Sequence, residues 1–203
     1  MAVVKRERTL VIIKPDGIQR CLVGEILKRY EQTGLKLIAA KMTVPTEEFA
    51  IKHYHEVGGD EWLENVGAKA RVAYEKKGMV SPFATNKENG WAVLKANAKY
   101  LSAGPVFCMV WEGNQACAVV RKITGSTEPA TSDVGTIRGD FAIDSYQLAD
   151  ADQRSLRNLI HASGNPAESE KEIKIWFKDE EILQYSHVSE KTLYEVNLDS
   201  IKE

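Results

Sequence analysis

The sequence predicts a single α+β domain in which helices pack on a four-stranded antiparallel sheet. The chain has 203 residues, of which 43% are hydrophobic, and this is enough to bury one sizeable core. Four apolar segments have the length and composition of buried strands, and stretches with helical periodicity lie between them. The resulting order, βα, βα, β, α, β, α, fits a sheet of the split βαβ kind.

The first two strands and the helices that follow them have clear boundaries. Residues 9–14 are rich in β-branched side chains and end at a Pro-Asp-Gly turn, which is typical of a buried strand. Apolar residues of 22–30 recur on one helical face, and Gly34 is the expected end of that helix. Residues 35–44 form the second predicted strand. Thr46 is the expected N-cap of a helix that extends to about residue 55.

The middle of the chain is less regular. Helical patches at 62–74 and 91–101 enclose a loop near 78–90, and residues 105–112 form the third predicted strand. A helix is expected at 114–124, followed by a loop at 126–140.

The last predicted elements are a short strand that begins at Leu159 and a helix behind it. Asn165, Pro166 and Glu168 give that helix a cap, a proline at the first position and an acid at the third. The helix carries Glu172. We see no internal repeat and no low-complexity linker.

Composition argues against several classes of protein. The formal net charge is −2, with 27 basic and 29 acidic residues, which does not favour a general nucleic-acid or membrane-surface binder. No apolar run approaches the length of a membrane span, and the N-terminus does not have the pattern of a secretory signal. The three cysteines have no metal-ligand spacing and are typical of reduced residues in a cytoplasmic protein.

Three short segments carry the chemistry. They are Ile13-Lys14-Pro15-Asp16-Gly17, Thr136-Ile137-Arg138-Gly139-Asp140-Phe141, and the stretch that contains Asn158, His161 and Ser163. In their order and surroundings they resemble the signature segments of nucleoside diphosphate kinases, and the resemblance extends from about residue 7 to 185. It implies a ferredoxin-like fold. It also implies a ping-pong reaction in which a nucleoside triphosphate such as ATP phosphorylates a histidine, which then phosphorylates a diphosphate.

The resemblance assigns the catalytic roles. His161 is the expected nucleophile, since neutral imidazole is a good nucleophile near neutral pH. Glu172 is expected to orient it, Ser163 to assist nearby, and Lys14 to reach a terminal phosphate as a point charge. Taken alone, His161 could be a core histidine, Glu172 a solvated helix carboxylate and Lys14 an ordinary strand-end lysine.

A second set of residues is expected to bind the nucleotide. Arg121 and Arg138 suit phosphate oxygens because the guanidinium fork donates two hydrogen bonds at once. Thr127 can donate from its hydroxyl, and Asn158 can bond the ribose or Lys14. The alternative for either arginine is a surface ion pair, and Arg121 could simply favour a helix C-terminus. Tyr54 is expected at the phosphate site, although it could instead pack beside His53 and His55. Trp62 is expected to stack on the base, and the alternative is a tryptophan of the core.

Metal ligands are not expected in the protein itself. His53 and His55 stand at i, i+2 on a helix and should point to different sides. The chain has no P-loop, since none of its 14 glycines is followed by lysine. We therefore expect Mg²⁺ to arrive on the nucleotide phosphates.

The chain also departs from the family pattern. Within the one domain, residues 1–203, we expect insertions at about 58–98 and 144–156, similar to those of some archaeal-type members. Gly164 stands where the family usually has aspartate, and Glu128 where it typically has asparagine. The two insertions leave the catalytic matches intact, and we expect them to bear on the shape of the base-binding mouth and the mode of subunit assembly.

Competing interpretations remain. A nucleotide-binding regulatory or interaction protein of the same fold would be free to lose part of the set His161, Glu172, Lys14, Arg121 and Arg138. A nucleic-acid-binding module would call for a basic patch that the net charge does not require. The resemblance implies a homo-oligomer, a hexamer in most relatives, with a tetramer or dimer as alternatives, and no nucleic-acid or membrane partner. The tail from residue 192 to 203 is polar and is expected either to be peripheral or to wrap a neighbouring subunit.

Overall fold

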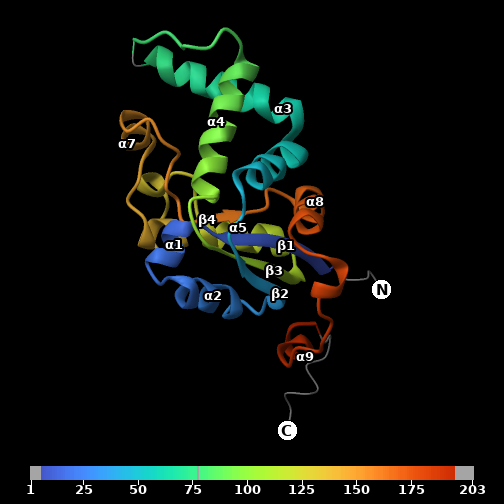
Figure 1. Ribbon diagram of the computed structural model, residues 1–203. Helices are drawn as coiled ribbons and strands as arrows, with labels where there is room; N and C mark the ends of the chain where they lie inside the picture. The colour runs from blue at the N-terminus through green and yellow to red at the C-terminus, as the bar shows by residue number, and fades with distance from the viewer. Residues whose placement is uncertain (1–5, 77, 195–203) are drawn as a thin grey trace.

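The computed structural model describes residues 6–76 and 78–194. Its centre is a four-stranded sheet in the order β2-β3-β1-β4 (Figure 1). The strands are β1 (Arg6–Ile13), β2 (Lys36–Thr43), β3 (Val106–Asn114) and β4 (Ile160–Ala162). Each neighbouring pair is antiparallel. The predicted four-stranded antiparallel sheet is therefore confirmed, and with its helices it forms a ferredoxin-like α+β fold.

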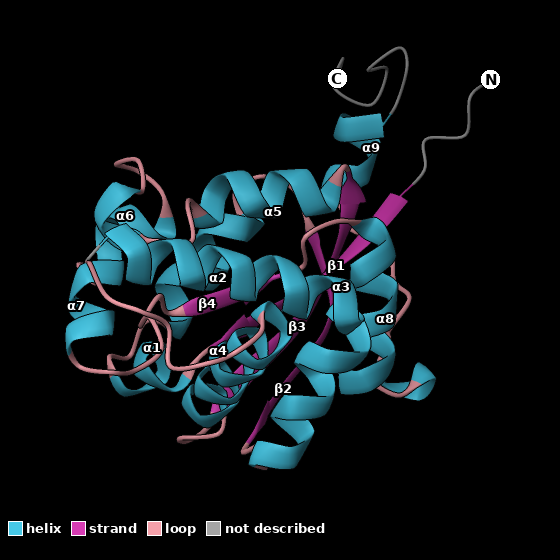
Figure 2. Cartoon of the chain, turned by 90° about the horizontal axis from the view of Figure 1, so that it is seen from above, coloured by secondary structure: helices cyan, strands magenta, loops and turns pink. Residues whose placement is uncertain are grey.

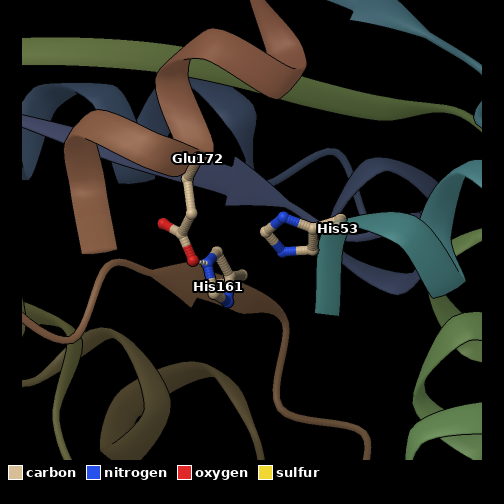
Figure 3. Close-up of side chains that lie close together, drawn as sticks. All are labelled: His53, His161 and Glu172. Carbon is tan, nitrogen blue, oxygen red and sulfur yellow. Dashed lines mark hydrogen bonds and ion pairs between the residues drawn. The ribbon is translucent and has the colours of Figure 1, made fainter. Parts of the chain in front are cut away.

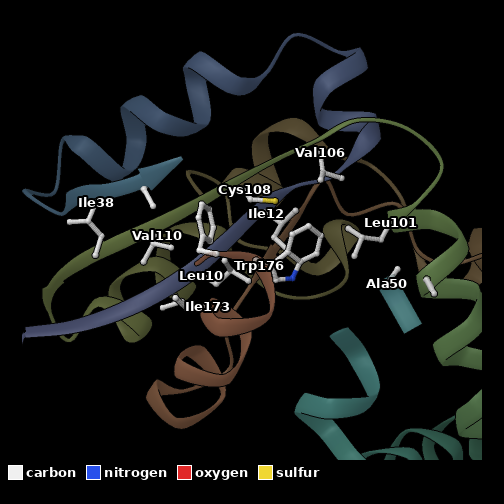
Figure 4. Packing of buried hydrophobic residues seen from close by; sticks show 13 residues of the cluster. Leu10, Ile12, Ile38, Ala50, Leu101, Val106, Cys108, Val110, Ile173 and Trp176 are labelled. Carbon is white, nitrogen blue, oxygen red and sulfur yellow. The ribbon is translucent and has the colours of Figure 1, made fainter. Parts of the chain in front are cut away.

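The central strand β1 contributes to two cores, one on each face of the sheet. Its side chains alternate between faces, as they must in a strand. Leu10 and Ile12 pack with residues of the helices α3 (Glu47–Lys76), α4 (Asn86–Leu101) and α8 (Pro166–Trp176), and Figure 4 shows this cluster. Val11 and Ile13 pack on the opposite face against α2 (Val23–Glu31), α5 (Ala116–Thr124) and α6 (Ile137–Phe141). Figure 2 shows helices on both sides of the strands. Because both faces are covered, the second half of β1, residues 10–13, is a continuous apolar run.

Helices α3 and α4 form a long hairpin that extends away from the sheet (Figure 1). Its α3 arm bends at Gly59, whose φ of 61° is non-helical and is accessible mainly to glycine. Farther out the two helices touch at glycines. A Cβ on Gly67 would stand 1.7 Å from the carbonyl oxygen of Asn86, and one on Gly90 would stand 2.1 Å from that of Leu63. The backbones can approach this closely only because neither position has a side chain.

Several predicted helix boundaries are correct. Thr46 accepts a hydrogen bond at 3.1 Å from the backbone N–H of Phe49 at the start of α3. Asn165 accepts one at 2.9 Å from Glu168 at the start of α8, with Pro166 in the first position. Such caps satisfy backbone donors that the helix itself leaves without partners.

Two expectations about secondary structure are wrong. The helix expected to end near residue 55 continues past it. After the bend at Gly59 the chain resumes helical geometry as far as Lys76, so the helical patch expected at 62–74 is confirmed as the outer part of the same element. The segment 126–140, expected to be a loop, contains a 3₁₀ turn, η1 (Pro129–Thr131), and the beginning of α6. The α6 helix is only one turn long, too short to show a periodic pattern, and its N-cap is Thr136.

The remaining elements lie around this framework. They are α1 (Pro15–Gln19), α7 (Tyr146–Ala151), η2 (Asp179–Glu181) and α9 (Ser189–Tyr194). The expected insertions correspond to most of the α3–α4 hairpin and to the segment around α7. Of the tail predicted to be peripheral, only the part up to Tyr194 is described, and residues 195–203 lie outside the described residues. No helix in the described ranges is both long and apolar enough to cross a membrane.

Candidate active site

His161 lies on β4, directly opposite Ile12 of the central strand. Opposed residues of an antiparallel pair project to the same face. Ile12 faces α3 and α8, so the His161 side chain faces those helices as well, and Figure 3 shows it between Glu172 of α8 and His53 of α3. The His161 side chain is 19% exposed, so a ligand can reach it.

Glu172 holds the ring of His161. Its Oε1 lies 2.9 Å from Nε2 of His161, and its Oε2 accepts a hydrogen bond at 2.5 Å from the hydroxyl of Ser163. The hydroxyl oxygen of Ser163 is itself fixed at 3.1 Å by the backbone N–H of Leu10 on β1. Ser163 thus contacts Glu172 rather than the imidazole, and it acts on His161 through the carboxylate.

This arrangement determines which nitrogen of His161 can react. A carboxylate only accepts, so Nε2 of the neutral ring carries the proton and Nδ1 keeps a free lone pair. Burial works to raise the pKa of Glu172, but the charge and hydrogen bond of His161, with His53 and Ser163, bring it below its usual value. Glu172 therefore stays ionised near neutral pH and can stabilise positive charge on the ring.

His53 is a neighbour that sequence reasoning did not assign to the site. Its ring is perpendicular to that of His161, with centroids 4.9 Å apart, and its side chain is buried. The indole Nε1–H of Trp176 donates to its Nδ1 at 3.1 Å, so the proton of the neutral ring sits on Nε2. Burial lowers the pKa of His53 to about 3, with a smaller contribution from His161.

His53 and His55 point to different sides of α3, as predicted. His55 stacks on Trp91 of α4, with centroids 5.0 Å apart and an interplanar angle of 22°. The signal for His53 in the sequence was its place next to Tyr54, a residue that was assigned to the site.

Lys14 stands between the end of β1 and the start of α1. Its ammonium donates to Oδ1 of Asn158 at 2.7 Å, the second of the two contacts anticipated for Asn158. The amide of Asn158 in turn donates to the carbonyl of Thr127 at 3.0 Å. Burial, together with the charge of Arg138, lowers the pKa of Lys14 to about 7. A bound anion would favour the charged form of this lysine.

Arg138 is buried and joins the two segments that border the site. Its guanidinium donates to the carbonyl oxygens of Gly125, Ser126, Asn158 and Ile160 at 2.7–3.2 Å. A guanidinium has five N–H groups, so these four bonds leave one for a ligand. Burial lowers the pKa of Arg138 to about 10, and it remains charged. Most of its donors therefore organise the backbone around the site.

Arg121 and Thr127 border the same region from the surface. Arg121 lies in the last turn of α5 and is exposed, and its side chain makes no hydrogen bond or ion pair to another described residue. It is close enough to Arg138 to lower the pKa of that guanidinium. The side chain of Thr127 is exposed as well. Both side chains are thus available to bind an anion.

The two aromatic candidates differ. Tyr54 is near the nucleophile, with its ring centroid 6.4 Å from that of His161. Burial raises the pKa of its hydroxyl, so the group stays protonated and can donate. Trp62 is half-buried just beyond the Gly59 bend, packs on Gly58, and makes no ring contact with another described aromatic residue. The structure thus brings Tyr54, but not Trp62, into contact with the other site residues.

Comparisons with known proteins identify the family. The family model described as nucleoside diphosphate kinase matches residues 7–89 and 70–182. A relative named nucleoside diphosphate kinase from Pyrobaculum aerophilum is 42% identical over 183 residues, which cover 88% of this chain and 98% of the relative.

Solved structures agree with this result. The crystal structure of the NDP kinase from Pyrobaculum aerophilum has a TM-score of 0.84 at 40% identity and covers 89% of this chain and all of that one. A nucleoside-diphosphate kinase from Borrelia burgdorferi, solved as a transition-state mimic with vanadate and ADP, has a TM-score of 0.75 at 37% identity, with 92% and 96% covered. The enzyme from Halobacterium salinarum in complex with CDP has a TM-score of 0.67 at 32% identity, with 94% and 100% covered. The sequence, the fold and the residues around His161 agree, and this chain belongs to the nucleoside diphosphate kinase family.

Proposed function

We propose that the chain is a nucleoside diphosphate kinase in which His161 carries the phosphate between two nucleotides. The observation that carries this proposal is the carboxylate of Glu172 on Nε2 of His161, which leaves Nδ1 as the nucleophile in a partly open site. The activity is that of the relatives by name, and one relative was solved with vanadate and ADP.

The reaction has two half-steps that mirror each other. Nδ1 of His161 attacks the terminal phosphorus of a nucleoside triphosphate such as ATP. An N–P bond forms, the P–O bond to the leaving diphosphate breaks, and the diphosphate departs. A terminal oxygen of a second diphosphate then attacks the phosphohistidine, forming a P–O bond and breaking the N–P bond. The Nε2 proton stays on the ring throughout, held by Glu172.

Cationic and hydroxyl groups supply the electrostatic part of catalysis. Lys14 offers two ammonium N–H groups beyond the one used by Asn158, and Arg138 offers one N–H. Arg121 and Thr127 add donors from the surface side, and the hydroxyl of Tyr54 adds one from α3. Fixed donors of this kind stabilise charge on a transferring phosphoryl group without reorganising during the reaction.

Magnesium fits the substrate better than the protein. Among described residues, the only cluster of three potential metal ligands is His53, His161 and Glu172. Two imidazoles do not suit a cation that prefers six oxygens, and Glu172 is already engaged by His161 and Ser163. We therefore propose that Mg²⁺ binds through the nucleotide phosphates, where it would neutralise part of their charge.

We also propose a homo-oligomeric, cytoplasmic enzyme. Strand β2 is at one edge of the sheet. Met42 near its end and Val44 just after it are 58% and 63% exposed, which suits an interface between subunits. The three cysteines are free thiols, as expected in the reducing cytoplasm. Light scattering of the purified protein tests the assembly. A hexameric mass is expected, with a tetramer or dimer as the alternatives and a monomeric mass as the contradiction.

Two finer points belong to the same proposal. Residues 58–98 and 144–156 are proposed to be insertions into the single domain. Trp62 is proposed to stack on the base, so Trp62→Ala should raise the Michaelis constant for nucleotide several-fold. An unchanged Michaelis constant would remove Trp62 from the site.

A labelling experiment tests the central proposal. The protein is mixed with Mg²⁺ and ATP labelled on its terminal phosphate, and acid-labile, base-stable label on protein is measured before and after addition of GDP. We expect wild type to take up label and GDP to discharge it as GTP. His161→Ala should take up no label. His55→Ala, which changes a histidine of α3 that stacks on Trp91, should behave as wild type.

Two outcomes would contradict the proposal in different ways. Nucleotide binding without label would favour a regulatory nucleotide-binding protein of the same fold. Label that survives in His161→Ala would show that another residue is the nucleophile.

A further inference from the structure

Tyr100 occupies a position between the α3–α4 hairpin and the catalytic lysine. It lies in the last turn of α4 and is partly buried. The ammonium nitrogen of Lys14 stands 4.8 Å from the centroid of its ring, within the range of a cation–π interaction. Its hydroxyl donates to Oδ1 of Asp16 at 2.7 Å. One side chain thus contacts both charged residues of the Lys14-Pro15-Asp16 turn.

Asp16 is a competitor for the ammonium of Lys14. The two residues are two positions apart, and the charge of Asp16 is close enough to raise the pKa of Lys14. Even so, the described structure contains no direct ion pair between them, and the ammonium donates to neutral Asn158 instead. The Asp16 carboxylate is engaged by Tyr100. A direct pair would place an anion where the proposed function needs a phosphate oxygen.

The phenol of Tyr100 can serve both contacts at once. Its pKa is raised, mainly by burial and then by Asp16, so the hydroxyl keeps its proton and remains a donor. The ring face carries the negative part of the aromatic quadrupole and therefore attracts the ammonium. The ring supports the cation while the hydroxyl restrains the anion.

We propose that Tyr100 is a positioning residue for Lys14: its ring supports the ammonium and its hydroxyl keeps Asp16 from pairing with it. Lys14 is thereby left free for an anionic phosphate. This inference rests on the proposed role of Lys14 at the phosphate. It also links the α3–α4 hairpin to the chemistry, because the end of α4 carries the residue that prepares Lys14.

A double-mutant cycle tests the inference. Tyr100→Phe keeps the ring and removes the hydroxyl, so Asp16 is released to pair with Lys14. The Michaelis constant for ATP should rise about three- to tenfold, which corresponds to the loss of one hydrogen bond. Adding Asp16→Asn to that variant removes the competing charge and should restore the Michaelis constant to within about twofold of wild type. A merely structural role for Tyr100 would instead make the two losses add.

A second readout does not depend on catalysis. The pKa of Lys14 is measured by NMR of ¹³Cε-labelled lysine without nucleotide, with Lys14→Met used to assign the signal. Asp16, Arg138 and His53 are the other titratable groups that act on Lys14. In Tyr100→Phe the pKa of Lys14 should rise, because Asp16 then faces the ammonium directly, and Asp16→Asn should reverse this rise.

The control and the opposing results are separate from those of the kinase proposal. Tyr74→Phe, a change on the same hairpin, should leave both readouts unchanged. An unchanged Lys14 pKa in Tyr100→Phe, or a double variant no better than the single one, would overturn the inference. Failure of His161 labelling in wild type would overturn the kinase proposal, and the NMR measurement would still decide whether Tyr100 positions Lys14.

Discussion

Replacing Glu172 by glutamine isolates the contribution of its charge. Both carboxylate oxygens are engaged, one by His161 at 2.9 Å and one by Ser163 at 2.5 Å, and the residue is 2% exposed. Glutamine keeps the shape and one acceptor for the Nε2–H of His161. Its amide group can donate to the hydroxyl of Ser163, so no buried polar atom loses every partner. The variant should therefore fold and differ mainly in electrostatics.

The expected loss can be bracketed. Phosphorylation at Nδ1 places positive charge on the imidazole ring of His161, and Glu172 stabilises it. Exchanging a charged for a neutral hydrogen-bond acceptor costs about 1.4 kcal/mol, which is about tenfold in rate. Full loss of attraction between two charges about 4 Å apart, at an effective dielectric constant of about 20, costs about 4 kcal/mol, or about a thousandfold. We expect the rate of histidine phosphorylation to fall between these limits.

Rapid-quench measurement of a single turnover with labelled ATP gives this rate directly. Glu170→Gln, on the same helix but paired with Arg8 at the surface, is the matched control and should stay close to wild type. A Glu172→Gln rate within twofold of wild type, in a protein with an unchanged melting temperature, would refute the reasoning.

The same substitution has a pH signature in stability. The pKa of Glu172 lies below its ordinary value of 4.5, so the unfolded chain binds the proton more tightly than the native one. The stability that its charge provides is therefore complete above pH 4.5 and is lost as pH falls through the native pKa. The difference in unfolding free energy between wild type and Glu172→Gln should shrink over that range.

Three further predictions concern the surroundings of the site. The pKa of Lys14 falls from 10.5 to about 7 on folding, so wild type should gain stability as pH rises between those values. Lys14→Met should therefore melt at a higher temperature than wild type at pH 6. A difference in melting temperature that does not narrow toward pH 10 would count against this pKa. Arg138→Lys should reduce turnover by roughly 10- to 100-fold, because an ammonium cannot replace a fork bonded to four carbonyls; turnover equal to wild type in a steady-state assay would show that the fork is dispensable. Gly90→Ala should lower the free energy of unfolding by about 1–3 kcal/mol, because its Cβ would meet the carbonyl of Leu63 at 2.1 Å. Gly24→Ala, in a helix with nothing within 4 Å of the new Cβ, should be neutral or stabilising in the same denaturant titration, and equal effects of the two changes would contradict the close crossing.

The sequence was most informative where local patterns determine structure. The apolar run of β1 and the caps at Thr46 and Asn165 were predicted correctly, because strand composition and capping depend on residues close together in the chain. The helical patch at 62–74 was also predicted from its local pattern, but its continuity with the helix before residue 55 was missed, since two glycines in a row usually end a helix.

The site shows the same division. The resemblance placed His161, Glu172, Lys14 and Asn158 together, and the structure brings them within hydrogen-bonding distance in pairs. The resemblance did not reveal that Arg138 donates four hydrogen bonds to backbone carbonyls, because those acceptors belong to no side-chain motif.

His53 and Tyr100 were missed for a related reason. Each reaches the site across the fold, His53 through the packing of α3 on α8 and Tyr100 through a contact 84 residues away in the chain. The only sequence signal for His53 was its place next to Tyr54, and no spacing within the sequence indicates the contact of Tyr100 with Asp16.

The hydrogen bond that the indole of Trp176 donates to His53 also affects how readily transition metals could bind in the site and inhibit the enzyme. The described part of the site holds two imidazoles and a carboxylate within 4.8 Å of one another, a set that zinc or copper would bind. Because Trp176 donates to Nδ1, the proton of neutral His53 is on Nε2, and ligation through Nε2 requires either breaking this hydrogen bond or removing the last proton from the ring. The tryptophan thus makes chelation costly in an open active site, and Trp176→Phe should make the protein more sensitive to micromolar zinc.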